Sequence, residues 1–256
     1  ALWDGICLLK LSDVAAALSA EAMRGIIDAY DERIHVIRPH KGQLDTARNM
    51  RELLKNSTLI TRQGELRVQD PYSIRCVPQV HGASKDSLAF VKEKVEIEIN
   101  SVTDNPIILP DGDVISGGNF HGEPMALPFD FLGIGLAEIA NISERRLERL
   151  LNNSLSGFPS FLVKHSGLNS GFMITQYAAA ALVSENKVLA HPASVDSIPS
   201  CENQEDLVSM GTHAGRKAGE IADNVSRVIA TEIFAKTGIF KLFWFIETIK
   251  IKVIPV

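Results

Sequence analysis

One stretch near the end of the sequence constrains the fold more than any other. Apolar residues recur there at intervals of three and four, at Leu207, Met210, Ala214, Ala218, Ile221, Val225 and Val228. A helix turns once in about 3.6 residues, so this spacing places all of them on one helical face. The pattern predicts a long amphipathic helix from about Gln204 to Phe234, which must bury its apolar face against other helices.

Similar patterns predict helices along most of the chain. Ser12 is expected to cap the first helix, and Pro124 to be the first residue of the longest one. The expected helices cover residues 12–26, 42–55, 84–99, 124–152 and 172–184. The segment 172–184 has no charged residue, so we expect it to be a central buried helix. The predicted fold class is all-α, a bundle of long hydrophobic helices with irregular active-site loops.

Two segments between these helices lack a helical period. Residues 61–83 mix charges with prolines, and residues 101–123 carry turn sequences around two short apolar runs. The runs 107–109 and 114–115 are expected to form a small hairpin. The predicted domains are a central helical domain over 1–235 and a divergent hydrophobic C-terminal tail over 236–256.

Composition excludes several classes of protein. The net charge is −5, which gives no basic surface for a nucleic acid. Three scattered cysteines indicate neither a disulfide scaffold nor a zinc cluster, and they favour a reducing, cytoplasmic location. No apolar run is expected to span a membrane, and no signal peptide opens the chain. Because the sequence begins at Ala1 without a methionine, we expect an internal piece of a longer polypeptide.

The segment from Gln69 to Arg75 is rich in reactive side chains. Gln69, Tyr72 and Arg75 are three residues apart, so a helical turn would place them on one face. Arginine offers a planar fork for a carboxylate, and tyrosine offers a hydroxyl that donates or accepts. On the spacing alone, an exposed, solvated loop with a capping aspartate is the favoured interpretation.

Two further segments are candidates. Glu205 lies where the last long helix is expected to begin, so it would act as an acid or base if buried, or merely complement the helix dipole. The glycines before Phe120 allow close approach of a ligand, although an ordinary glycine turn is the simpler interpretation. The seven histidines show no metal-ligand spacing and are expected at the surface, and no metal or nucleotide site is predicted.

Four sequence blocks together resemble the aromatic amino-acid ammonia-lyases, in that family's order and spacing. They are Gln69-Asp70-Pro71-Tyr72-Ser73-Ile74-Arg75-Cys76-Val77-Pro78-Gln79-Val80-His81-Gly82, Ser101-Val102-Thr103-Asp104-Asn105-Pro106, Gly117-Gly118-Asn119-Phe120-His121-Gly122 and Asn203-Gln204-Glu205-Asp206. The likeness is expected to cover residues 8–235, and the last block is similar to the histidine branch of the family.

The resemblance implies elimination of ammonia from L-histidine to give urocanate. It also implies a methylidene-imidazolone prosthetic group, made from an internal Ala-Ser-Gly, and a homotetramer whose sites are shared between subunits. Carried over by motif, Tyr72 and Glu205 would be catalytic. Gln69, Arg75 and Phe120 would bind the substrate, with Arg75 holding its carboxylate.

The chain departs from the family pattern at one decisive point. It contains no Ala-Ser-Gly, since Ala83-Ser84 is followed by Lys85. The electrophile is therefore expected to come from sequence outside this chain, which alone is expected to be inactive. Two alternatives remain: a catalytically inactive, lyase-derived helical oligomer with a structural role, or a tyrosine or phenylalanine ammonia-lyase or aminomutase.

Overall fold

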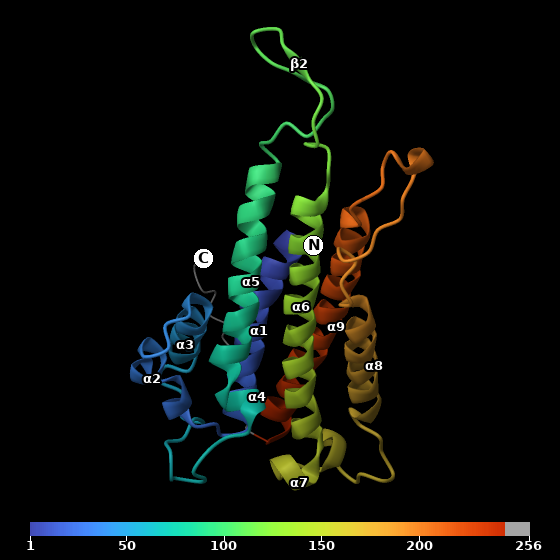
Figure 1. Ribbon diagram of the computed structural model, residues 1–256. Helices are drawn as coiled ribbons and strands as arrows, with labels where there is room; N and C mark the ends of the chain where they lie inside the picture. Colours follow the sequence, from blue (N-terminus) through green and yellow to red (C-terminus); the bar gives the residue numbers. More distant parts are fainter. Residues whose placement is uncertain (244–256) are drawn as a thin grey trace.

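A computed structural model describes residues 1–243, and nearly all of its regular structure is helical (Figure 1). The elements are α1 (Leu2–Ala22), η1 (Ile27–Tyr30), α2 (Glu32–Val36), α3 (Lys41–Leu53), α4 (Tyr72–Arg75), α5 (Val77–Glu98), β1 (Ile107–Ile108), β2 (Val114–Ile115), α6 (Glu123–Leu151), α7 (Asn153–Ser156), η2 (Ser160–Leu162), α8 (Met173–Leu189), η3 (Cys201–Asn203) and α9 (Gly211–Phe243). The predicted all-α class is confirmed.

The long helices lie side by side along one direction, with α6 in the middle (Figure 1). Leu132, Leu136 and Ile139 recur at spacings of four and three on α6 and are fully buried. They share one core with Ile221 and Val225 from the predicted stripe of α9. From Ala214 onward the stripe therefore buries its apolar face as its spacing predicts, which confirms the helix but not its predicted start.

The central helix α6 is the one helix of residues 1–243 that is long and apolar enough to cross a bilayer. In this fold it packs against α5, α8 and α9, and half of its most apolar window is buried inside the protein. The apolar residues of α6 therefore pack within a helix bundle, as expected from the sequence.

Two glycines bring α3 and α5 into backbone contact. A Cβ atom at Gly42 would lie 2.1 Å from the carbonyl oxygen of Gly82, and one at Gly82 would lie 2.4 Å from the amide nitrogen of Gln43. No side chain fits at either position, because both obstacles are backbone atoms. The glycine that ends the first sequence block therefore has a packing role.

Several helix boundaries differ from the predicted ones. α1 begins ten residues before Ser12, whose hydroxyl is buried in mid-helix and donates to the carbonyl of Leu9 at 2.8 Å. Ser12 is therefore not a cap. α5 begins at Val77 rather than Ser84, because Pro78 is well suited to a first helical turn. α9 begins at Gly211, seven residues after Gln204.

The helix α8 is not the central buried helix that the uncharged segment 172–184 predicts. It lies at the edge of the bundle (Figure 1), and only Ala179 and Asn186 are fully buried. Ile174 and Tyr177 are each 59% exposed. A lack of charged residues shows that a segment is apolar. It does not show whether the segment is buried within its own chain.

The predicted hairpin is confirmed, with Ile107 paired to Ile115 and Ile108 to Val114 in antiparallel register. At the other end of the sequence, α9 continues through residue 235 to Phe243. The rest of the predicted tail, residues 244–256, lies outside the described residues, so the division at 235 stays a prediction.

We predict that the chain self-associates through α6 and α8. Leu127, Phe131 and Ile134 recur at four and three on α6 and are each 44% exposed, and Ile134 lines a groove shared with α8. An obligate interface is large and apolar, as this surface is.

Light scattering at micromolar concentration should give a mass above the 28.0 kDa of one chain. Ile134→Glu should shift the mass towards the monomer, whereas Ile37→Glu, the same change at an exposed position away from α6 and α8, should not. A sharp monomer mass for the unchanged chain would contradict the prediction.

Candidate active site

Residues 67–75 form a short, well-anchored turn rather than a solvated loop. The carboxylate of Asp70 is almost fully buried and accepts the amide N–H of Ile26 at 2.6 Å and the Nε–H of Arg67 at 2.6 Å. Arg67 in turn donates to the carbonyls of Met23 and Arg24 at 2.8 and 2.9 Å. The turn is therefore fixed to the end of α1.

Arg75 is the last residue of α4, and its guanidinium is oriented from two sides. Its Nε donates to the carbonyl oxygen of Asp70 at 2.9 Å, and its guanidinium carbon lies 4.7 Å from the ring centroid of Tyr72. Tyr72 is 70% exposed and Gln69 is also exposed. Gln69 precedes α4, so only Tyr72 and Arg75 share a helical turn as predicted.

Phe120 lies in a loop that other motif residues hold in place. The side-chain oxygen of Asn105 accepts hydrogen bonds from the hydroxyl of Ser116 at 3.0 Å and from the amide of Gly117 at 2.8 Å. The loop leaves Phe120 57% exposed. Around Gly117 and Gly118 there is open space where a Cβ would stand, so a neighbouring group can approach the backbone.

Glu205 lies in the same region as Phe120 but not at the start of a helix. It sits in the loop between α8 and α9, six residues before α9, and it is exposed. Its Oε2 accepts the hydroxyl of Ser200 at 2.6 Å. Glu205 therefore does not complement the α9 dipole, which acts only within the first turn of a helix, and within this chain it is not buried as the acid or base interpretation required.

Two contacts tie the Glu205 loop to the start of α6. His121 shares a hydrogen bond with the carbonyl of Leu207 at 2.9 Å. Asp130 accepts the amide of Ser194 at 2.7 Å, and Lys217 lies 3.8 Å from the same carboxylate. Phe120 and Glu205 are therefore presented together at one end of the bundle.

The two groups of site residues lie at opposite ends of the molecule. Figure 1 shows α4 at the bottom of the bundle and the β1–β2 hairpin and the orange loop around η3 at the top. Helix α5 separates them, and its 22 residues span about 33 Å at 1.5 Å per residue. Within one copy, Arg75 and Glu205 therefore cannot touch the same small molecule.

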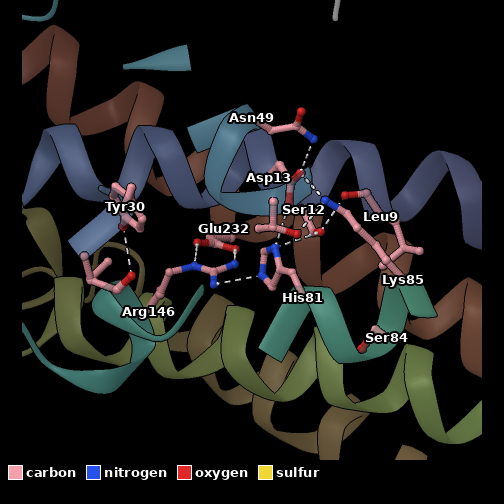
Figure 2. Close-up of polar contacts among 12 residues, drawn as sticks. Leu9, Ser12, Asp13, Tyr30, Asn49, His81, Ser84, Lys85, Arg146 and Glu232 are labelled. Atoms are coloured by element: carbon pink, nitrogen blue, oxygen red, sulfur yellow. Dashed lines mark hydrogen bonds and ion pairs between the residues drawn. The ribbon is translucent and has the colours of Figure 1, made fainter. Parts of the chain in front are cut away.

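The sequence did not indicate a buried network of charged groups in the middle of the bundle, which Figure 2 shows. Arg146 of α6 makes two parallel bonds to Glu232 of α9, at 2.6 and 3.0 Å, and all four of these nitrogen and oxygen atoms belong to fully buried side chains. Lys236 and Ser143 also bond to this carboxylate. Ser19 donates to it at 2.7 Å, which adds α1 to the network.

The same network continues into α5 through a histidine predicted to be at the surface. His81 is fully buried, with Nε2 3.4 Å from Arg146 and Nδ1 2.8 Å from Asp13. Because Arg146 only donates, Nδ1 of His81 carries the proton and donates to Asp13. His35 is buried too, so the surface prediction is wrong for both histidines.

Burial and charge set the protonation of these groups. Burial lowers the pKa of His81 despite the nearby carboxylate, so the imidazole stays neutral. Burial opposes ionisation of Asp13 and Glu232, yet the pKa of each stays below its usual value. For Asp13 the causes are the His81 hydrogen bond and the Lys85 charge, and for Glu232 the charges of Arg146 and Lys236. In the sequence, the one hint of this buried network is that Glu232 and Lys236 are four residues apart within a largely apolar helix.

Over residues 1–243, no group of histidine, cysteine, aspartate and glutamate side chains has a geometry that could hold a metal ion. The chemistry at both ends of the bundle is that of arginine, tyrosine, phenylalanine and glutamate. One end can bind a carboxylate, and the other offers an exposed carboxylate and an exposed aromatic ring on neighbouring loops.

The chain matches a known protein family. The family model for aromatic amino acid lyases matches residues 1–242, so the chain belongs to the aromatic amino acid lyase family. The match extends beyond residues 8–235 at both ends, which corrects the narrower likeness expected from the motifs.

Within that family the chain is similar to histidine ammonia-lyases. It is 74% identical to that of Clostridium tetani and 70% identical to that of Streptococcus gordonii, in each case over 92% of this chain and 46% of the relative. The histidine ammonia-lyase structure from Trypanosoma cruzi superposes with a TM-score of 0.88, at 47% identity over 97% of this chain and 47% of that one. The chain thus spans about half the length of the relatives it matches.

A structure with a different activity has the same fold. Tyrosine aminomutase from Streptomyces globisporus superposes with a TM-score of 0.91, at 36% identity over 94% of this chain and 50% of that one. The backbone alone therefore does not distinguish these activities, whereas sequence identity favours the histidine ammonia-lyases.

We predict that Glu232→Gln strongly destabilises the chain. The change leaves Arg146 and Lys236 buried beside a neutral amide, and breaking a buried pair in this way typically costs about 3–5 kcal/mol. Urea unfolding followed by circular dichroism measures the free energy of unfolding.

Glu220→Gln is the matched control, since Glu220 is on the same helix but exposed. It should change the free energy of unfolding by less than about 0.5 kcal/mol. Equal, small losses for both variants would show that the buried pair contributes little.

Proposed function

We propose that this chain is the helical part of a histidine ammonia-lyase, which eliminates ammonia from L-histidine to give urocanate. The supporting observation is 74% identity with the Clostridium tetani histidine ammonia-lyase across 92% of the chain, against 36% with a tyrosine aminomutase of the same fold. An inactive structural role is less consistent with this, because all five site residues expected from the motifs are present.

The separation of the two ends of the bundle supports a site built from several copies. Arg75 and Glu205 lie at opposite ends of the bundle, beyond the two ends of α5, which is itself about 33 Å long, so one substrate can meet both only where different copies bring opposite ends together. We infer a homo-oligomer, a tetramer as in the family, with the exposed faces of α6 and α8 at its interfaces. The three cysteines are free thiols, which supports a reducing, cytoplasmic setting.

Arg75 is suited to hold the substrate carboxylate. Its Nε is occupied by the Asp70 carbonyl, and within the described chain no hydrogen bond uses its two Nη atoms. A guanidinium held in this way presents two parallel N–H donors to a carboxylate. Tyr72 covers one face of the guanidinium and, with Gln69, lines this end of the site.

Glu205 and Phe120 act at the other end. Phe120 offers an exposed ring for packing, and Glu205 an exposed carboxylate that meets the substrate imidazole or transfers a proton. The elimination breaks the bond from Cα to the amine and removes a proton from Cβ, so ammonia and urocanate are the only products. Holding both reacting carbons in place accounts for a large part of such catalysis.

The residues present could lie next to the family's methylidene-imidazolone group, but they could not form it. The sequence has no Ala-Ser-Gly from which to make it, but the Phe120 ring and the open space at Gly117 and Gly118 leave room for a group from another segment. When bound, this group withdraws electrons so that the amine can leave.

We predict activity only when the missing electrophile is supplied. The chain alone, mixed with L-histidine, should give no urocanate absorbance in the ultraviolet. A chimera in which the chain replaces the matching segment of the Clostridium tetani relative should form urocanate. Turnover by the isolated chain, or a folded but inactive chimera, would count against the proposed function.

In the same chimera, Glu205→Gln should lower kcat by about 100-fold, as expected on losing a general acid or base. The melting temperature should hardly change, since Glu205 is exposed and, among residues 1–243, Ser200 is its one side-chain hydrogen-bond partner. Glu202→Gln, an exposed change in the same loop, is the control and should leave kcat unaltered. Full activity of Glu205→Gln would remove Glu205 from the site.

A further inference from the structure

The junction between α4 and α5 leaves one carbonyl without its usual partner. In a continuous helix, the carbonyl of Ile74 would accept the amide N–H of residue 78. That residue is Pro78, which has no N–H. Ile74 is buried, so water cannot readily satisfy its carbonyl, and an unpaired buried acceptor is costly.

Tyr30 supplies the missing donor from a distant part of the chain. Its hydroxyl donates to the Ile74 carbonyl at 2.8 Å, and Figure 2 shows it reaching across from η1. The side chain is 1% exposed and packs in a cluster with Met50 and Leu54. Burial raises the pKa of Tyr30, so its hydroxyl keeps the proton that it donates.

The anchored carbonyl adjoins Arg75 directly. Ile74 precedes Arg75, and the peptide group between them includes the oxygen that Tyr30 holds. On the other side, the Arg75 side chain is held by the carbonyl of Asp70, whose carboxylate is fixed to Ile26 and Arg67. Backbone and side chain of Arg75 are thus restrained from two independent elements.

We propose that Tyr30 is a positioning residue for Arg75, holding the backbone from which its guanidinium reaches the substrate carboxylate. The role rests on the proposed function, because it assumes that Arg75 binds a carboxylate. Tyr30 does not touch the substrate. It replaces the hydrogen bond that Pro78 cannot make, and the turn thereby keeps one geometry.

A positioning role and a merely structural one have different consequences. If Tyr30 holds Arg75 for the carboxylate, losing the hydroxyl weakens a contact made equally in the ground state and the transition state. Such a loss raises KM while kcat stays near its original value. If Tyr30 only stabilises the core, the melting temperature falls and KM is unchanged.

The first test uses Tyr30→Phe in this chain, which keeps the ring in its cluster and removes only the hydroxyl. Hydrogen exchange followed by mass spectrometry should show about tenfold faster exchange in peptides covering 72–80. Ser84→Ala is the matched control, because Ser84 likewise donates from a buried hydroxyl to a carbonyl, that of Gly135, at 2.8 Å. It should leave exchange in 72–80 unchanged.

The second test uses the chimera with L-histidine. Tyr30→Phe should raise KM by about 3- to 10-fold with kcat within about twofold, and Arg75→Lys should raise KM further. Asp70→Asn should also raise KM, because it weakens the second restraint on Arg75. Ser84→Ala should leave KM as it is.

The outcomes separate the two proposals. Unchanged exchange in 72–80, or faster exchange with an unchanged KM, overturns the positioning role of Tyr30. If the parent chimera with Tyr30 intact makes no urocanate, the proposed function fails instead. The exchange experiment then still decides whether Tyr30 holds the Arg75 turn.

Discussion

The paired bonds between Arg146 and Glu232 are the interaction on which the rest of the bundle depends. They join the two longest helices, α6 and α9, where neither side chain reaches water. Removing two charges from water is costly, so the pair is stable only because Ser19, Ser143 and Lys236 satisfy the remaining positions of the carboxylate. Ser143 lies on α6 with Arg146, Lys236 on α9 with Glu232, and Ser19 on α1. These three helices must therefore keep their register for all the bonds to form, which restricts how they can slide.

This ionic centre lies between the two ends that carry the site residues. One end presents Arg75 and Tyr72 on a turn fixed to α1, and the other presents Phe120 and Glu205 on loops fixed to α6. Neither group is held by the network directly. The network instead fixes the helices from which both groups project, so each end keeps its shape while different copies supply the complete site.

The sequence predicts the architecture well and the polar interior poorly. Apolar periodicity located α6 and α9, since an amphipathic helix carries its own period, and turn residues located the hairpin. Periodicity cannot show that His81 meets Asp13, 68 residues away, because that contact depends on tertiary packing. Periodicity also placed the start of α9 too early, at Gln204, because Leu207 and Met210 continue the apolar spacing although they precede the helix. The motifs predicted the site residues but not that Arg75 and Glu205 lie at opposite ends of the bundle. That separation arises because α5 runs from one end of the bundle to the other.

Helix α5 has a further consequence for how this sequence can change over time. Its length sets the spacing between the two ends, and one deleted residue would shorten it by about 1.5 Å and rotate everything beyond by about 100°. His81 would then lose its register with Asp13, or Ser84 with Gly135. Insertions and deletions are therefore excluded from α5, while substitutions on its exposed face are tolerated. Changes in length are expected instead in exposed turns without a site residue, such as 110–113 between β1 and β2, where extra residues alter neither the length of α5 nor the site loops.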